Sequence, residues 1–152
     1  GLVAELSAHE NVVGVKDSRG SLDLVAELVK DCRPGFQVLV GNGAVVYASL
    51  ELGAVGGILA VANLDPGRSV GIVESFSAGR SAEAGRLQEM VGPVHKAVVG
   101  GLGVAGVKAG TDLLGLRGGD PRPPLAPLGE EGRKEVRRVL ERARLLGRPA
   151  VR

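Results

Sequence analysis

The 152-residue chain contains one cysteine, Cys32, no tryptophan, and only 2% aromatic residues. A single cysteine excludes an internal disulfide and is typical of proteins from a reducing compartment. The cysteine and the two histidines lie far apart in the sequence, so they show no spacing typical of metal ligands. We therefore expect neither a disulfide framework nor a metal site.

Long apolar runs and a strong charge of one sign are also missing. No apolar run approaches the roughly 18 residues of a membrane span, and the first residues lack the basic start and apolar centre of a signal peptide. The net charge is +2, and the arginines of residues 132–148 alternate with glutamates, which predicts a solvated amphipathic helix. We expect a cytoplasmic protein that binds neither nucleic acid nor membrane.

The order of apolar and polar segments predicts an α/β protein. Continuous apolar stretches at residues 12–16, 36–40 and 57–62 read as buried strands, and amphipathic helices separate them. Such alternation indicates a parallel sheet covered by helices. Further helices are expected at residues 81–98, 104–115 and 129–146, with a glycine-rich joint between the first two. We divide the chain into an α/β part, residues 1–78, and a helical part, residues 79–152.

The stretch NVVGVKDSRG places Lys16 at the end of the first strand. Ligands of parallel α/β folds bind at the carboxyl ends of strands, and Gly14, on the same face, leaves space beneath the lysine stem. In a closed, dry lumen, desolvation would lower the pKa of the amine and make it a nucleophile toward carbonyl carbon. From spacing alone, a strand-end lysine that simply reaches water remains the simpler interpretation.

Three motifs, GVKDSRG, VLVGNG and LGAVGGILAVAN, resemble in order and spacing the C-terminal part of the dihydrodipicolinate synthase and N-acetylneuraminate lyase family. The resemblance implies a fold class, namely strands six to eight of a (β/α)8 TIM barrel followed by a helical C-terminal domain. It also implies a homo-oligomer when the protein is full length. Because the chain starts at Gly1 and its only methionine is Met90, we expect it to be a piece of a longer protein.

The resemblance also implies a site. Lys16 would form a Schiff base with the C2 carbonyl of pyruvate or a related 2-oxo acid, and the product enamine would react with an aldehyde. Gly41 would let the backbone approach the substrate, Ile58 would line bound pyruvate, and Ser18 would touch the distal part of the substrate in some members. Taken alone, Gly41 also fits a tight turn and Ile58 an ordinary core position. No metal or organic cofactor is implied.

Two motifs of the family are missing from the sequence: a G-[ST]-[ST] carboxylate loop and a Y-N-x-P segment with the catalytic tyrosine. The only tyrosine, Tyr47, lies in an expected helix. We therefore expect the isolated chain to be inactive or nearly so. The KDS tripeptide with GGILAVAN leans toward 4-hydroxy-2-oxoglutarate aldolase-like or generic synthase members. The alternative is a non-catalytic remnant, an interaction module that pairs with a separate N-terminal half.

Two other features invite functional interpretations. Residues 101–106, GLGVAG, match the G-x-G-x-x-G dinucleotide pattern, but a proline-rich loop follows where a βαβ unit needs another strand. With 25 glycines in the chain, chance matches to this pattern are expected. His95 lies near a helix end without a catalytic partner, and we expect a surface or interface residue there.

Overall fold

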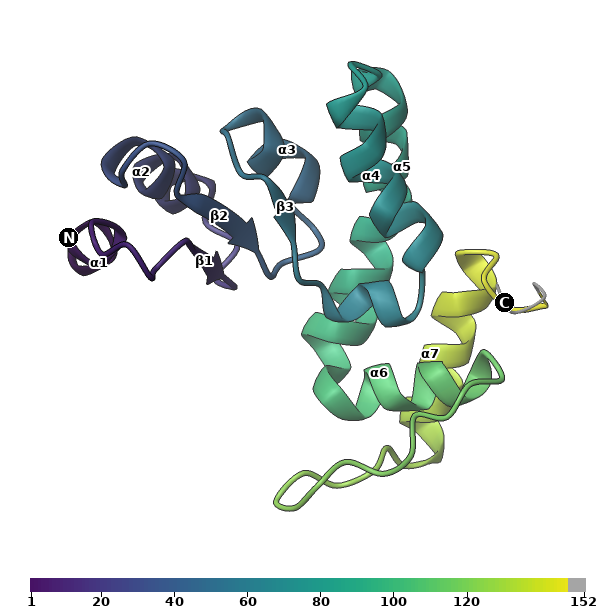
Figure 1. Cartoon of the computed structure of the whole chain (residues 1–152). Coiled ribbons are helices and arrows are strands. Elements are labelled where there is room, and N and C mark those ends of the chain that lie inside the picture. Colours follow the sequence, from purple (N-terminus) through teal and green to yellow (C-terminus); the bar gives the residue numbers. More distant parts are fainter. Residues whose placement is uncertain (148–152) are drawn as a thin grey trace.

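A small parallel sheet and a larger group of helices make up the fold (Figure 1). The computed structural model describes residues 1–147. The elements follow in the order α1 (Leu2–Ser7), β1 (Gly14–Asp17), α2 (Leu22–Asp31), β2 (Gln37–Val40), α3 (Val46–Glu51), β3 (Gly56–Gly57), the 3-10 turn η1 (Ala60–Asn63), α4 (Pro66–Ser77), α5 (Ser81–Val94), the π-helical turn η2 (His95–Gly100), α6 (Gly101–Leu113) and α7 (Glu130–Arg142).

Local capping chemistry explains where the first long helices start. The hydroxyl of Ser21 accepts a hydrogen bond from the Leu24 amide at 3.3 Å and begins α2. The carboxylate of Asp65 accepts one from the Arg68 amide at 3.4 Å, and Pro66 occupies the first position of α4. Side-chain oxygens at these positions satisfy helix amides that have no partner within the helix.

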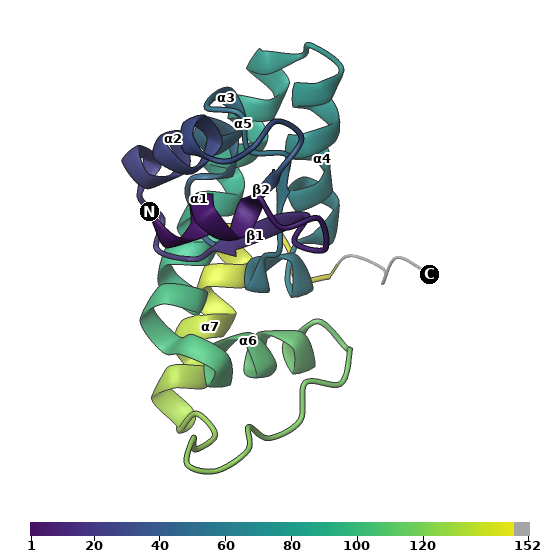
Figure 2. The same ribbon diagram turned by 60° about the vertical axis from the view of Figure 1, so that its left-hand side comes forward.

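The three strands pair in the order β1-β2-β3, all parallel. Helices α2 and α3 cover one face of the sheet (Figures 1 and 2). The covered face continues into the core, where α4, α5 and η2 pack against the same cluster. The best-buried apolar side chains of this cluster are Val25, Val38, Val40, Val46, Val61, Ile72, Val91, Val94, Val98, Val136 and Leu140.

The fold-class prediction was wrong. We expected an arc of a closed barrel, its sixth to eighth strands, followed by a helical domain. The residues 1–147 form an open three-stranded sheet, β3 is two residues long, and β1 and β3 each leave one edge unpaired within this part of the chain. A barrel needs strands that pair around a complete ring. The predicted domain boundary falls in the turn between α4 and α5, which pack along each other, and the division into two domains stays a prediction.

The third strand is shorter than the sequence predicts. The apolar run at residues 57–62 leaves the sheet after Gly57 and turns at Ala60–Asn63, where the Asn63 amide group donates to the Ala60 carbonyl at 3.1 Å. Val61 is fully buried in this turn. A short apolar run only indicates burial, and periodicity alone does not separate a strand from a buried turn.

The expected glycine-rich joint after residue 98 is a continuous helical run. The chain passes from α5 through η2 into α6, and Gly100 and Gly101 take helical dihedral angles. Within α6, Gly103 departs from them, with φ 60° and ψ −150°. The GLGVAG stretch therefore follows a π-helical turn and lies inside a helix, without the preceding strand that a dinucleotide-binding loop requires.

By length and composition, the run Ser81–Leu113 is long and apolar enough to cross a membrane. Its Val91, Val94 and Val98 side chains are at most 1% exposed and belong to the protein core. Gly103 interrupts its regular geometry. These contacts favour a helix of a packed protein over a membrane span.

The same helical run holds the loop that follows β2. Gln88 donates from Nε2 to the Gly43 carbonyl at 2.9 Å and accepts from the Tyr47 amide at 2.9 Å. Nδ1 of His95 accepts a hydrogen bond from the Gly43 amide at 3.2 Å. His95 is 8% exposed, so our expectation of a surface residue was wrong. A Cβ at position 43 would lie 2.6 Å from a methyl carbon of Val61 and 3.0 Å from Nδ1 of His95, which explains the glycine there.

Burial lowers the pKa of His95 below 6.5. The unfolded chain therefore binds more protons than the native state at pH values between the two pKa values. The contribution of His95 to the free energy of unfolding is complete above about pH 6.5 and is lost as the pH falls from there toward the native pKa. Protonation would also replace the acceptor that faces the Gly43 amide with a donor.

We predict that His95→Asn, which keeps an acceptor without a titrating ring, weakens this pH dependence in urea unfolding series between pH 5 and 7.5. His95→Ala leaves the Gly43 amide unpaired and should cost about 1–3 kcal/mol of unfolding free energy. His9→Asn, at the exposed histidine, is the matched control and should keep the wild-type slope. An unchanged slope in His95→Asn would contradict the prediction.

Candidate functional site

The register of β1 on β2 sorts the side chains of the site onto two faces. Val15 pairs with Val38 and Asp17 with Val40, and the two β2 valines are buried on the helix-covered face. Lys16 lies between Val15 and Asp17 and pairs with Leu39, which lies between the two valines. Since side chains alternate across a strand, Lys16 and Leu39 project from the face that α2 and α3 do not cover.

Three of the predicted site residues meet on this face. A Cβ atom built on Gly41 would lie 2.6 Å from Cε of Lys16 and would also overlap the Ser18 hydroxyl. Real Cβ atoms do not approach other atoms so closely, so with any other residue at position 41 the Lys16 and Ser18 side chains would have to take other positions. The geometry therefore brings Lys16, Ser18 and Gly41 into direct proximity.

Ile58 lies on the same side but apart from these three residues. Its amide donates to the Val40 carbonyl at 2.9 Å, which continues the β3 pairing by one residue. By alternation from Gly56, which pairs with Leu39, its side chain projects from the uncovered face, where it is 56% exposed. It stands two strand spacings from β1, about 10 Å.

Backbone and side-chain contacts fix the end of β1, and sequence reasoning missed them. The Asp17 carbonyl accepts a hydrogen bond from the Gly41 amide at 2.6 Å. The Asp17 carboxylate is buried and accepts from the Arg19 amide at 3.1 Å and from Nε of Arg19 at 2.8 Å. The acidic residue next to Lys16 thus shapes the turn after the strand from the opposite face. An Asp directly after an apolar strand is the sequence signal for this turn, because its carboxylate can bind the backbone amide two residues on.

Gly14 has a different role from the expected one. We expected it to leave space beneath the lysine stem. A Cβ at this position would instead lie 2.5 Å from the backbone oxygen of Gln37 on β2. Gly14 therefore allows β1 to approach β2 closely and supports the strand pairing that orients Lys16.

The surroundings of Lys16 are open in this chain. Its side chain is exposed, so these 147 residues do not supply the dry enclosure that the sequence-based mechanism needs. A cavity of about 360 Å³ near the outer edge of the sheet is lined by Leu39, Gly56, Val70 and Val73, among others, and Lys16 is not part of its lining. Enclosure of the lysine would have to come from additional polypeptide.

The only tyrosine of the sequence lies in the helical layer. Tyr47 donates from its hydroxyl to the Glu51 carboxylate at 2.9 Å, and its ring meets Phe76 edge-on. The hydrogen bond to Glu51 is the main cause that raises the pKa of Tyr47. The residue belongs to α3, on the other side of the sheet from Lys16, and is not placed to move protons there. Among residues 1–147, no cluster of three or more histidine, cysteine, aspartate or glutamate side chains could hold a metal ion.

Comparison with known proteins gives consistent matches. Residues 2–143 match the dihydrodipicolinate synthetase family. The 4-hydroxy-tetrahydrodipicolinate synthase of Methanoculleus marisnigri is 36% identical over 140 residues, which are 91% of this chain and 48% of that protein. The dihydrodipicolinate synthase of Thermotoga maritima superposes with a TM-score of 0.85 at 27% identity, over 95% of this chain and 50% of that one.

A third match agrees in fold. YagE, a prophage protein of E. coli K12 belonging to the dihydrodipicolinic acid synthase family and solved in complex with pyruvate, gives a TM-score of 0.84 at 24% identity. It covers 95% of this chain and 50% of that one.

The chain thus spans about half the length of the relatives it matches. These proteins have a TIM-barrel fold as a family, but the half-length match, together with the small open sheet, overturns the assignment of this chain to strands six to eight of a barrel. The recognition of the family itself is confirmed, because its pattern extends over nearly the entire sequence. The chain belongs to the dihydrodipicolinate synthetase family.

Proposed function

We propose that this chain supplies the Schiff-base lysine, Lys16, of a lyase or synthase that acts on pyruvate or a related 2-oxo acid. The observation that carries the proposal is the passage of the Lys16 side chain over Gly41, beside Ser18, on the uncovered face of the sheet. This arrangement gathers an amine, a hydroxyl and an open backbone at the carboxyl ends of two parallel strands, where ligands of such folds bind.

The proposed reaction begins at the Lys16 amine. Its unprotonated Nζ adds to the C2 carbonyl carbon of the 2-oxo acid, and the carbonyl oxygen leaves as water with the two amine protons. Protonation of the imine nitrogen and loss of a proton from C3 give an enamine, whose C3 attacks the carbonyl carbon of an aldehyde; the aldehyde oxygen takes up a proton, and water hydrolyses the regenerated imine to free the product and the Lys16 amine. The reverse sequence cleaves the same carbon–carbon bond. The protonated imine accepts the electron pair, so the chemistry requires no metal or organic cofactor.

Several residues near Lys16 support this role. Ser18 offers a hydroxyl beside the lysine, and the Gly41 amide is engaged with Asp17, which holds the loop at the end of β2 in place. Ile58 presents an exposed apolar side chain on the same face. We propose that Ser18 contacts the distal part of the substrate and that Ile58 lines the methyl side of the 2-oxo acid.

The matches narrow the chemistry. The relatives named above are synthases by description, which favours a synthase over the 4-hydroxy-2-oxoglutarate aldolase alternative. The similar E. coli protein was solved with pyruvate, and pyruvate is therefore the first ligand to test. Homo-oligomerisation of the longer protein, a cytoplasmic location and an aldehyde as second substrate stay predictions.

An interaction role is the second candidate. Val13 and Val55, beside the two outer strands, are 64% and 51% exposed, and the strand edges near them are unpaired within residues 1–147. Such edges and apolar side chains favour contact with another polypeptide. Under this alternative the chain pairs with a separate polypeptide and Lys16 has no chemistry of its own.

We predict that pyruvate followed by borohydride adds a carboxyethyl group to Lys16 in preference to the exposed lysines Lys30 and Lys134, because the proposed substrate contacts, Ser18 and Ile58, lie on the same face of the sheet as Lys16; peptide mass spectrometry locates the label. Lys16→Met should abolish the preferred label, and Lys30→Met should leave it unchanged. Because Lys16 is exposed in this chain, turnover with an aldehyde should stay near background. Equal labelling of all exposed lysines would contradict the catalytic proposal and favour the interaction role.

We predict that Gly41→Ala lowers labelling of Lys16, because the new Cβ occupies the path of the lysine side chain. A displacement of about 1 Å at a reacting group costs as much as about 100-fold in rate. Both close neighbours are movable side chains, so the melting temperature should change little. Gly85→Ala in α5, where a Cβ meets nothing within 4 Å, is the matched control and should keep wild-type labelling. Wild-type labelling in Gly41→Ala would show that this glycine serves the loop alone.

A further inference from the structure

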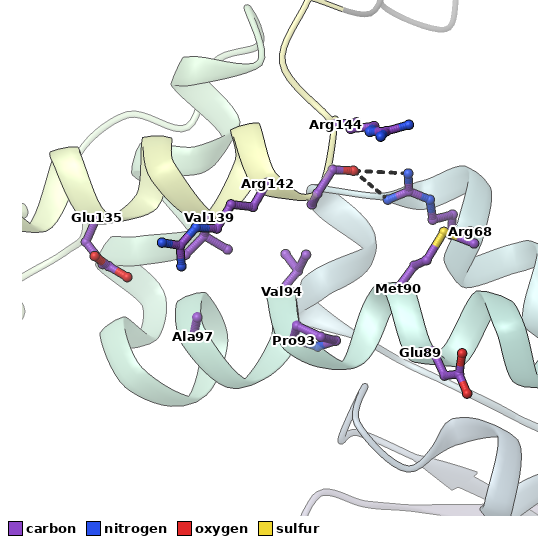
Figure 3. A pocket seen from close by; sticks show the side chains of 11 residues that line it. Arg68, Glu89, Met90, Pro93, Val94, Ala97, Glu135, Val139, Arg142 and Arg144 are labelled. Carbon is purple, nitrogen blue, oxygen red and sulfur yellow. Dashed lines mark hydrogen bonds between the residues drawn. The ribbon is translucent and has the colours of Figure 1, made fainter.

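A second cavity lies among the helices, away from the sheet. It has a volume of about 570 Å³ and is formed between α5 with η2 on one side and α7 on the other, with Arg68 of α4 at one end (Figure 3). Met90, Pro93, Val94, Ala97 and Val139 give it an apolar lining. Cavities that bind small molecules commonly have 300–1,000 Å³, apolar walls and a few polar groups.

Positive charge stands at both ends of this cavity. Figure 3 shows the Arg142 side chain running along α7 past Val139, toward the end where Ala97 lies. Arg144 lies at the opposite end, near the guanidinium group of Arg68. Neither Arg142 nor Arg144 forms an ion pair with a carboxylate among residues 1–147.

The other charges of the lining are compensated or turned away. Arg68 pairs with Asp65 at 2.9 Å, and Glu135 pairs with Arg138. The carboxylate of Glu89 points away from the other side chains of the cavity in Figure 3. Each end therefore has one arginine without a carboxylate partner among residues 1–147, with an apolar stretch between the two.

At the C-terminal end of α7, an arginine binds a backbone carbonyl that would otherwise disfavour an anion. A helix C-terminus ordinarily repels negative charge through its unpaired carbonyl groups. Here Arg68 donates two hydrogen bonds to the Ala143 carbonyl, at 3.0 and 3.1 Å. Because Arg68 already binds this carbonyl, the Arg144 side chain is not needed to cap the helix and can bind another group.

Arg144 occupies a backbone conformation that favours glycine. Its φ is 55°, which makes it the one non-glycine residue with positive φ among residues 1–147. The chain leaves α7 there through hydrogen bonds from the Arg144 amide to Glu141 and from the Leu145 amide to Leu140, both at 2.9 Å. Helices that end in this way commonly carry glycine at that position. The backbone conformation of Arg144 therefore costs free energy, and this residue is part of the cavity lining.

We propose that this cavity binds a linear dicarboxylate, with one carboxylate at Arg142, the other at Arg144, and the hydrocarbon between them against Met90, Val94 and Val139. Charge-assisted pairs of arginine with carboxylate supply the ends, and burial of the methylene groups supplies the middle. The site uses other elements than Lys16 and is independent of the function proposed above.

The test uses octanedioate as the probe and Met90 as the reporter. Met90 is the only methionine of the sequence, so protein labelled with ¹³C at the methionine methyl group gives a signal from the cavity itself. Octanedioate should shift this signal with one saturable transition, and octanoate, which lacks one carboxylate, should bind about tenfold more weakly, a loss of about 1.4 kcal/mol. Octanediol, which is uncharged, should not shift it at the same concentrations.

Variants then test the two arginines separately. Arg142→Gln and Arg144→Gly should each reduce octanedioate affinity about tenfold, whereas Arg137→Gln, on the same helix outside the cavity, should keep it. Glycine relieves the positive φ at position 144, so the melting temperature of Arg144→Gly should not fall, and its weaker binding cannot reflect unfolding. Equal binding of octanoate and octanedioate, wild-type affinity in Arg144→Gly, or no Met90 shift with octanedioate would each overturn the proposal.

Discussion

The parallel register of β1 on β2 is the constraint on which the candidate site depends. It sends Val15 and Asp17 toward the helix-covered face with Val38 and Val40, and it leaves Lys16 on the other face. A shift of one residue would exchange the faces and bury the lysine against helices. Burial of two β2 valines thus determines the direction of a lysine on the neighbouring strand. The close approach at Gly14 keeps the two strands in this pairing.

Features with a local cause could be predicted from the sequence. The caps at Ser21 and Asp65, Pro66 at the start of α4, and the first two strands follow from residues within a few positions of each element. The family could also be recognised from the sequence. Three short motifs in the right order, of which the first contains Lys16, carry more information than their periodicity alone.

Features that depend on distant contacts could not be predicted. The burial of His95 results from its contact with Gly43, 52 residues away in the chain, and nothing in the local sequence signals it. The short β3 reflects where Val61 finds core contacts, and the cavity at Arg144 exists only where α4, α5 and α7 meet. The prediction of a barrel arc with an enclosed lysine was wrong for a similar reason. A resemblance to part of a family indicates common ancestry, whereas the exposure of Lys16 depends on which residues of the chain lie opposite it.

The helical run from α5 into η2 connects two regions that are separate in function. On one side it holds the loop after β2 through Gln88 and His95, next to the glycine that Lys16 passes over. About half a helical turn away, it presents Met90, Val94 and Ala97 to the arginine-ended cavity. One helical run therefore fixes two regions at once, the loop beyond β2 through one of its faces and the wall of the cavity through another.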